Sequence, residues 1–422
     1  MRAMDYISST NICYLTCDTL RLIDERPIVH GMRVAYMMMK MLECKGSYDE
    51  YEVAEFAFLT MIHDIGVYRT NPITDEAAYD TEGAGTAHAV YGALFLKQVS
   101  PFGSRADIIM YHHLPYSKVG RLNYEYSKVA MYLYLLEDVD RLFLKEGAAL
   151  DTRELEAGAG QRYLPEAISL LARCIRQEGM LKKLESGEYL KELQAFMENV
   201  LFTNEEKENY MRFIMHCFSL KGRMRTLEAI MCSCIVDEIA QSMELTGREK
   251  DKLYYAAMLH DIGLMAIDPE ILKGAKKFTE EERTAYRKHV GIGRELLEKY
   301  FIVKEIADIS SAHHEMLDGS GYPEGLKENQ ISNNQAILQV ADNVTAVLNM
   351  KRKLTRSEIL SILQVQAQRK RLHKKAVSGV TDNYDTIQNR LRSETQEYLD
   401  LHVKINDRYK RLIGGSSSGG RA

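Results

Sequence analysis

The sequence predicts an all-α protein made of two tandem copies of one helical domain, and three observations support this. At 422 residues the chain is too long for one ordinary hydrophobic core. It holds only seven prolines and is rich in Leu, Met, Glu, Lys and Ala, which favour helices. The strings IHDIG and LHDIG each open a series of histidines in one register, since His88 to His112 and His289 to His313 both span 24 residues. An internal repeat of about 200 residues accounts for this register.

The predicted division of the chain follows changes in these patterns. The expected parts are a first domain at 1–180, a charged helical connector at 181–215, a second domain at 216–383, a long helix at 384–413 and a flexible tail at 414–422. We therefore expect two helical bundles joined by a helical connector.

The first helices of the chain are placed by the residues that break them. The first two dozen residues read as one helix, and Pro27 fits the first turn of the next, where its missing N–H costs nothing. That second helix ends near Gly46. A third helix at about 49–65 carries IHDIG and is expected to stop at Gly66, as a left-handed C-cap. A polar loop at 69–86 follows, and the second domain repeats the series.

The long helix near the C-terminus carries apolar residues at three-four spacing. They are Ile387, Leu391, Tyr398, Leu401, Ile405 and Leu412. We expect this seam to pack on its own domain. An intermolecular coiled coil, and hence a homodimer, is the alternative.

Charge and cysteine content exclude several classes of protein. With 55 basic and 60 acidic side chains the net charge is −5, which gives no reason to expect binding of duplex nucleic acid. Phosphate chemistry would therefore rely on local cations, metals included. The seven cysteines form no CxxC pair, and no apolar run is long enough to span a membrane. We expect a soluble, cytoplasmic protein with reduced thiols and no membrane partner.

The repeated histidines and aspartates are candidate metal ligands. Both residue types bind first-row divalent cations without thiolates. Nine of the twelve histidines belong to the pattern, which favours metal binding over hydrogen-bonded core histidines. The candidates in the second domain are His260, Asp261, His289, His313, His314 and Asp342. Those in the first domain are His30, His63, Asp64, His88, His112, His113 and Asp138. For an aspartate such as Asp138, a helix cap or an ion pair is the alternative.

Adjacent His and Asp residues suit a centre of more than one ion. Neighbouring side chains on a helix point about 100° apart, so both reach one centre only if it lies beside the helix. The two oxygens of an aspartate can bridge two metals, and two ions about 3.5–4 Å apart can polarise a phosphodiester for in-line attack.

The motifs of the second domain resemble those of the HD-GYP family, a branch of the HD-domain metal-dependent phosphohydrolases. LHDIG, KHVGIG, HHEMLDGSGYPEGL and VAD occur in the family's order and cover about 130 residues. The first domain resembles the same family, with HHLPYSKVGRL in place of the signature loop.

This resemblance implies an all-α fold with two or three divalent metals that hydrolyses cyclic dinucleotides, chiefly cyclic di-GMP. We expect two ions per active site, with iron or manganese favoured and nickel, zinc or magnesium as alternatives. The resemblance implies that the six candidates of the second domain are metal ligands, with Asp261 bridging and with His260 and Asp261 as the catalytic pair. The loop expected to shape the substrate pocket contains Asp318, Gly319, Gly321, Tyr322 and Pro323. Its glycines permit close backbone approach, and Tyr322 offers a stacking face.

The sequence departs from the family pattern at several positions. Val67 and Leu264 follow the two HDIG strings where the family has lysine, so a cation that would meet substrate phosphate is missing twice. Met316 stands where arginine is expected. Glu228 occupies the place of a histidine, 32 residues before His260. These departures leave two alternatives to the phosphodiesterase. The chain could be a catalytically degenerate module that binds cyclic dinucleotides in signalling, or an HD phosphohydrolase acting on mononucleotides.

Overall fold

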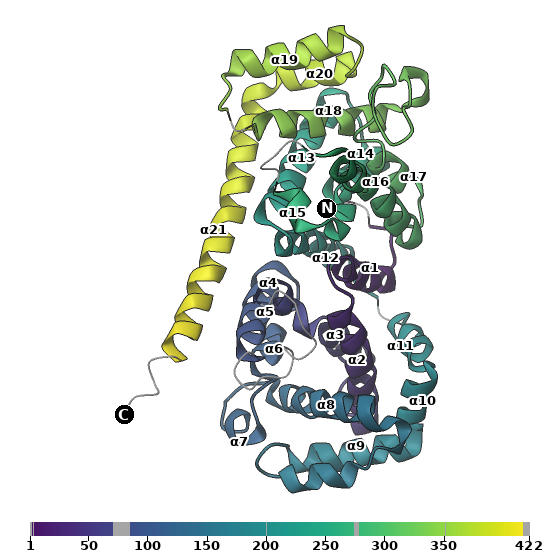
Figure 1. Ribbon diagram of the computed structural model, residues 1–422, viewed down its shortest axis with the longest axis vertical. Helices are drawn as coiled ribbons and strands as arrows, with labels where there is room; N and C mark the ends of the chain where they lie inside the picture. The colour runs from purple at the N-terminus through teal and green to yellow at the C-terminus, as the bar shows by residue number, and fades with distance from the viewer. Residues whose placement is uncertain are drawn as a thin grey trace. The chain divides into compact units, whose positions relative to one another are not determined.

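A computed structural model describes residues 2, 4–70, 85–199, 201–273, 278–350 and 352–416. These described residues are mostly helical and form no β-strand, which confirms the predicted all-α fold (Figure 1). Within them, no helix has the length and apolar character needed to cross a membrane. Most of the predicted polar loop (71–84) and the end of the predicted tail (417–422) lie outside the described residues.

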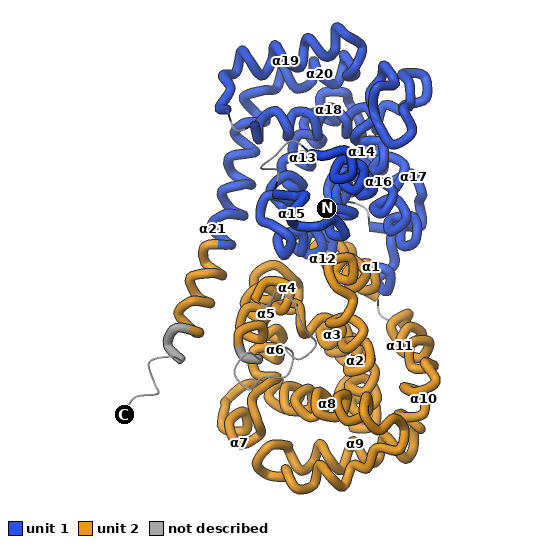
Figure 2. Tube along the Cα trace, in the orientation of Figure 1, with its two compact units in different colours: residues 1–11, 211–402 blue, residues 12–210, 403–422 orange. Residues whose placement is uncertain are grey.

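The chain divides into two compact units (Figure 2). The N-unit consists of residues 12–210 and 403–422, and the C-unit of residues 1–11 and 211–402. The domain boundaries drawn from the sequence stay predictions.

The N-unit carries the first series of candidate ligands on its helices. It contains all or part of α1 (Ser9–Arg21), α2 (Arg26–Lys45), α3 (Glu50–Met61), α4 (Val67–Thr70), α5 (Gly85–Val99), α6 (Asp107–Tyr111), α7 (Tyr116–Val119), α8 (Ser127–Glu146), α9 (Pro165–Glu178), α10 (Met180–Ser186), α11 (Tyr189–Met197) and α12 (Asn204–Cys217). Helix α2 packs against α3 and α8, and α5 packs against α6. Helix α2 has Pro27 in its first turn and ends at Gly46 with φ 68°, as predicted.

The C-unit carries the second series. It contains all or part of α13 (Arg223–Ser242), α14 (Gly247–Leu259), α15 (Pro269–Leu272), α16 (Glu280–Tyr300), α17 (Glu305–Ser310), α18 (Asn333–Leu348), α19 (Arg356–Gln368), α20 (Lys374–Asp382) and α21 (Tyr384–Ser416). Helix α13 packs against α14 and α18, and α16 packs against α17. The same pairs of corresponding helices are therefore packed within each unit, which supports the internal duplication.

The prediction that Gly66 is a left-handed C-cap is wrong. Helix α3 ends at Met61, a short 3-10 helix follows at His63–Gly66, and Gly66 does not adopt a positive φ. The glycine is required by a close approach instead, because a Cβ on it would lie 2.0 Å from the carbonyl oxygen of His88. Gly263 repeats this contact, with the same 2.0 Å to the carbonyl oxygen of His289. In each unit the HDIG glycine thus lets the next histidine helix lie directly on the HD turn.

Candidate metal centres

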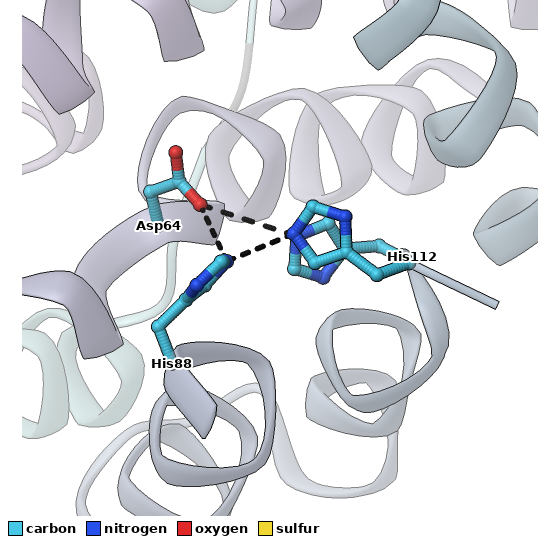
Figure 3. Close-up of side chains that lie close together, drawn as sticks. Asp64, His88 and His112 are labelled. Carbon is cyan, nitrogen blue, oxygen red and sulfur yellow. Dashed lines mark hydrogen bonds and ion pairs between the residues drawn. The ribbon is translucent and has the colours of Figure 1, made fainter. Parts of the chain in front are cut away.

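Four predicted ligands of the N-unit form one cluster. Asp64 lies in the 3-10 helix, His88 on α5 and His112 in the turn after α6 (Figure 3). His113 follows His112 in the same turn. Asp64 Oδ1 is 3.1 Å from His88 Nε2 and 3.9 Å from His112 Nε2, and His88 Nε2 is 2.9 Å from His113 Nε2. One ligand atom from each residue lies within 4.8 Å of the others, so a single ion can contact all four.

A second set of ligands adjoins this cluster. It consists of His30 on α2, His63, and Glu137 on α8, with all three ligand atoms within 4.8 Å of one another. Glu137 Oε1 is 2.7 Å from His63 Nε2 and 3.2 Å from His30 Nε2. The other oxygen of Asp64, Oδ2, is 3.6 Å from His63 Nε2. Asp64 therefore turns one carboxylate oxygen to each set, the arrangement that a bridging ligand needs.

Asp138 does not join the ligands with which the sequence grouped it. Its carboxylate pairs with Arg141 and with Arg162, whose Nη2 is 2.7 Å from Oδ2, and it accepts a 2.6 Å hydrogen bond from the Tyr163 hydroxyl. One residue along a helix turns the side chain by about 100°. This rotation directs Glu137 to the histidines and Asp138 away from them, so Glu137, and not Asp138, joins the group of side chains that could hold an ion.

We predict that Glu137→Gln lowers the metal content of the N-unit, because it removes a charged oxygen between His30 and His63. The Asp138→Asn variant, changed at the neighbouring position, should keep the wild-type content. Metal analysis of both purified proteins checks this. A loss of metal in Asp138→Asn together with an unchanged metal content in Glu137→Gln would contradict the geometry.

The C-unit brings all six of its predicted ligands together. Asp261 Oδ1 is 3.5 Å from His289 Nε2 and 3.7 Å from His313 Nε2, while its Oδ2 is 3.5 Å from His260 Nε2. Asp261 thus faces histidines with both oxygens, as Asp64 does in the N-unit.

Asp342 on α18 closes the C-unit cluster from the opposite helix. Its Oδ1 is 3.8 Å from His260 Nε2, and its Oδ2 is 3.4 Å from His314 Nδ1. Beside Asp261, His289 Nε2 and His313 Nε2 lie 3.3 Å apart. The arrangement offers two carboxylates and four imidazoles to more than one cation.

A hydrogen bond to the backbone orients histidine rings in both units. In five of them, Nδ1 lies 2.5–2.8 Å from the backbone carbonyl oxygen three residues earlier. They are His63, His112, His260, His289 and His313. Because a carbonyl only accepts, Nδ1 carries the proton, and the lone pair of Nε2 is directed into the cluster.

The histidines differ in their electrostatic state. Neighbouring carboxylates outweigh burial and raise the pKa of His63 and of His260. Burial and the neighbouring histidines hold the pKa of His112 and of His313 well below the usual value. Burial likewise lowers the pKa of His113 and of His289 to about 4. These last four rings are neutral at pH 7, the form that binds metal.

Two buried ring nitrogens supply a further test of fit. Within the described chain, Nε2 of His112 and Nε2 of His314 are buried and have no hydrogen-bond partner. A buried polar atom without a partner is costly, and a metal ion removes that cost. The residues present therefore suit the divalent ions that the resemblance implies.

The two units differ where the N-unit has His30. The C-unit has Glu228 there, and Arg225 Nη1 lies 2.8 Å from its Oε2. Burial raises the pKa of Glu228 to about 7, and the charges of Asp261 and Asp342 add to the rise. Arg225 in turn helps to lower the pKa of Asp261, together with the surrounding histidines that outweigh burial. A guanidinium–carboxylate pair in the C-unit thus lies near the centre, where the N-unit has the set formed by His30, His63 and Glu137.

The loop 318–323 is fastened beside the C-unit cluster by a residue that the sequence did not single out. Buried Glu315 accepts hydrogen bonds from the backbone N–H groups of Glu324, at 2.7 Å, and Leu326, at 2.8 Å. Within the loop, the backbone N–H of Ser320 donates to Asp318 Oδ1 at 3.0 Å. A Cβ on Gly321 would lie 2.5 Å from backbone atoms of Glu315, so only glycine fits there.

Tyr322 is half-buried beside the candidate ligands, and its ring contacts two side chains. One contact is with the ring of His314, at 4.6 Å between centroids, and another is with the guanidinium carbon of Arg287, 4.6 Å from the Tyr322 centroid. The ring therefore links Arg287 to the centre, which leaves less of it open for stacking than the sequence suggested.

Sequence reasoning missed Glu137, Arg225, Arg287 and Glu315. Glu137 and Glu315 each adjoin a residue of the motif, and Arg225 precedes Glu228 by one helical turn. The sequence shows that Glu137, Glu315 and Arg225 lie close to the motif residues along the chain. It does not show which way their side chains point, because this depends on tertiary packing.

Comparison with known proteins agrees with these motifs. Residues 208–375 match the family model described as HD domain. Over 402 residues the chain is 23% identical to 3'3'-cGAMP-specific phosphodiesterase 1 of Vibrio cholerae serotype O1, a match that covers 89% of each chain. Over 177 residues it is 30% identical to a cyclic di-GMP phosphodiesterase of Thermotoga maritima, covering 40% of this chain and 47% of that protein.

A solved structure is also similar along most of the chain. It is a cyclic GMP-AMP specific phosphodiesterase of V. cholerae, V-cGAP3, with a TM-score of 0.54 and 15% sequence identity over 90% of this chain and 98% of that one. At this identity the match shows a shared fold. Together the comparisons confirm the resemblance that the motifs of the second domain indicated.

Proposed function

We propose that this chain, an HD-domain protein over residues 208–375, is a metal-dependent phosphodiesterase that opens a cyclic dinucleotide to a linear product. One observation carries the proposal: six histidines and aspartates converge in the C-unit beside the loop 318–323. The names of the relatives support the substrate class, since they are phosphodiesterases of cyclic dinucleotides.

The residues of the C-unit would bind the metal ions and form the substrate pocket. His260, Asp261, His289, His313, His314 and Asp342 would hold the ions. Bound divalent cations would polarise the phosphodiester and supply a nucleophile at neutral pH. Asp261, buried and facing histidines with both oxygens, would fix the spacing of the ions. The backbone of the loop, held by Glu315, would bound the substrate pocket and limit access of water.

Two substrates are favoured within this class. Cyclic di-GMP is the substrate suggested by the motifs and by the name of the T. maritima relative. The relative that matches over 89% of both chains is named for 3'3'-cGAMP, and this favours the mixed dinucleotide as a second candidate. We propose a cytoplasmic location, consistent with seven free cysteines, and retain the homodimer as an alternative for α21.

Turnover of both dinucleotides by the full chain tests the proposal. Protein purified without oxygen and supplied with iron or manganese should convert one of them to a linear dinucleotide, detected by chromatography. A chelator should abolish the conversion, and the metal should restore it. A metal-loaded protein that binds a cyclic dinucleotide without turnover would instead be the degenerate signalling module, and turnover of mononucleotides alone would favour the third reading.

A further inference from the structure

Three arginines among the described residues of the C-unit are engaged by carboxylates. Arg225 pairs with Glu228 at 2.8 Å. Arg294 contacts three carboxylates, at distances from 2.8 to 3.4 Å. Arg371 lies 3.7 Å from Asp318 of the loop. These three arginines therefore hold parts of the protein together.

The position after HDIG offers no cation either. Leu264 stands there and is 1% exposed, packed in the core. A cyclic dinucleotide carries two phosphates, and the ions of the centre can neutralise the one that reacts. The second phosphate needs a cation from elsewhere in the unit.

Arg287 is different from the other arginines. It lies on α16, two residues before His289, and is exposed. No carboxylate of the described chain lies within ion-pair distance of it, and its guanidinium contacts the ring of Tyr322. Stacking on an aromatic ring fixes the plane of a guanidinium while its N–H edge stays free.

The geometry also says which phosphate Arg287 can reach. His314 and Arg287 both contact the ring of Tyr322, each at 4.6 Å from its centroid. The guanidinium thus contacts the same aromatic ring as a candidate metal ligand. A phosphate held at the ions would be met by the histidines, whereas one farther along the substrate would be met by Arg287.

We propose that Arg287, stacked on Tyr322, binds the non-scissile phosphate of the cyclic dinucleotide and so selects substrates with two phosphates. This rests on the proposed function of the C-unit and adds a specificity residue to it. The planar guanidinium can donate two parallel N–H bonds to phosphate oxygens.

Two substrates and three proteins test this. The wild-type chain, Arg287→Ala and the matched control Lys288→Ala are compared on the cyclic dinucleotide and on bis(p-nitrophenyl) phosphate, which has one phosphate. Arg287→Ala should lower kcat/KM for the dinucleotide about 10- to 100-fold relative to the small diester, mainly through KM. Lys288, the exposed neighbour on α16, should give the wild-type ratio. Metal content should be equal in all three proteins.

An unchanged ratio in Arg287→Ala, or an equal fall in Lys288→Ala, would overturn the inference while leaving the phosphodiesterase intact. If the wild-type protein binds the dinucleotide without turnover, the proposed hydrolysis fails, and the Kd of Arg287→Ala decides the inference by the same factor. If it neither binds nor hydrolyses any cyclic dinucleotide, both proposals fall.

Discussion

Replacing Asp261 by asparagine is expected to lower kcat for the cyclic dinucleotide at least about a thousandfold, or roughly 4 kcal/mol in the activation free energy. The residue is 8% exposed, and its two carboxylate oxygens face His260, His289 and His313 at 3.5–3.7 Å. An amide presents only one oxygen and no charge, so the spacing of two ions would be lost. Steady-state turnover by the metal-loaded variant measures the effect.

Asp64→Asn is the matched control for this prediction, because Asp64 has the same place in the N-unit. Its turnover should stay near that of the wild-type chain if the C-unit carries the reaction. A variant pair with the opposite result, active at Asp261→Asn and inactive at Asp64→Asn, would move the active centre to the N-unit.

Gly263→Ala is expected to be nearly as damaging to activity through packing alone. The added Cβ would lie 2.0 Å from the carbonyl oxygen of His289 and 2.8 Å from the backbone nitrogen of Gly293. Helix α16 must then shift away from the HD turn, which we expect to cost about 1–3 kcal/mol of unfolding free energy. Turnover should fall at least about a hundredfold, because small misplacements of reacting groups have effects of this size.

Gly291→Ala separates this effect from a general cost of changing α16. Gly291 lies on the same helix and has no atom within 4 Å of an added Cβ, so alanine should stabilise the helix by up to about 1 kcal/mol. Denaturant unfolding and turnover of both variants check the pair. Equal stability and equal activity of Gly263→Ala and the wild-type chain would refute the close approach.

Sequence periodicity was sufficient for the fold class and for most candidate ligands. A histidine such as His289 could be assigned because its distance from His313 repeats that of His88 from His112. The spacing reports position along the helix, and an Nδ1 bond to a backbone carbonyl then sets the ring direction locally. These ligands could therefore be predicted from features that are local in the sequence.

The sequence failed where direction depends on helices far apart in the chain. Asp138 and Glu137 differ by one residue, and only the packing of α8 against α2 decides which of them faces His30. Gly66 resembled a helix end, since a sequence does not show that α5 crosses it. The sequence suggested that the ring of Tyr322 is open for stacking. It does not show the contacts of this ring, which come from α16 and from the turn after α17.

The metal content of the anaerobically purified chain tests the central claim most directly. We expect bound divalent ions in both units of the wild-type protein, with Asp64→Asn and Asp261→Asn each losing part of them and the double variant losing nearly all. Cyclic dinucleotide turnover by protein that holds no divalent metal, or unchanged metal content in the double variant, would contradict this expectation.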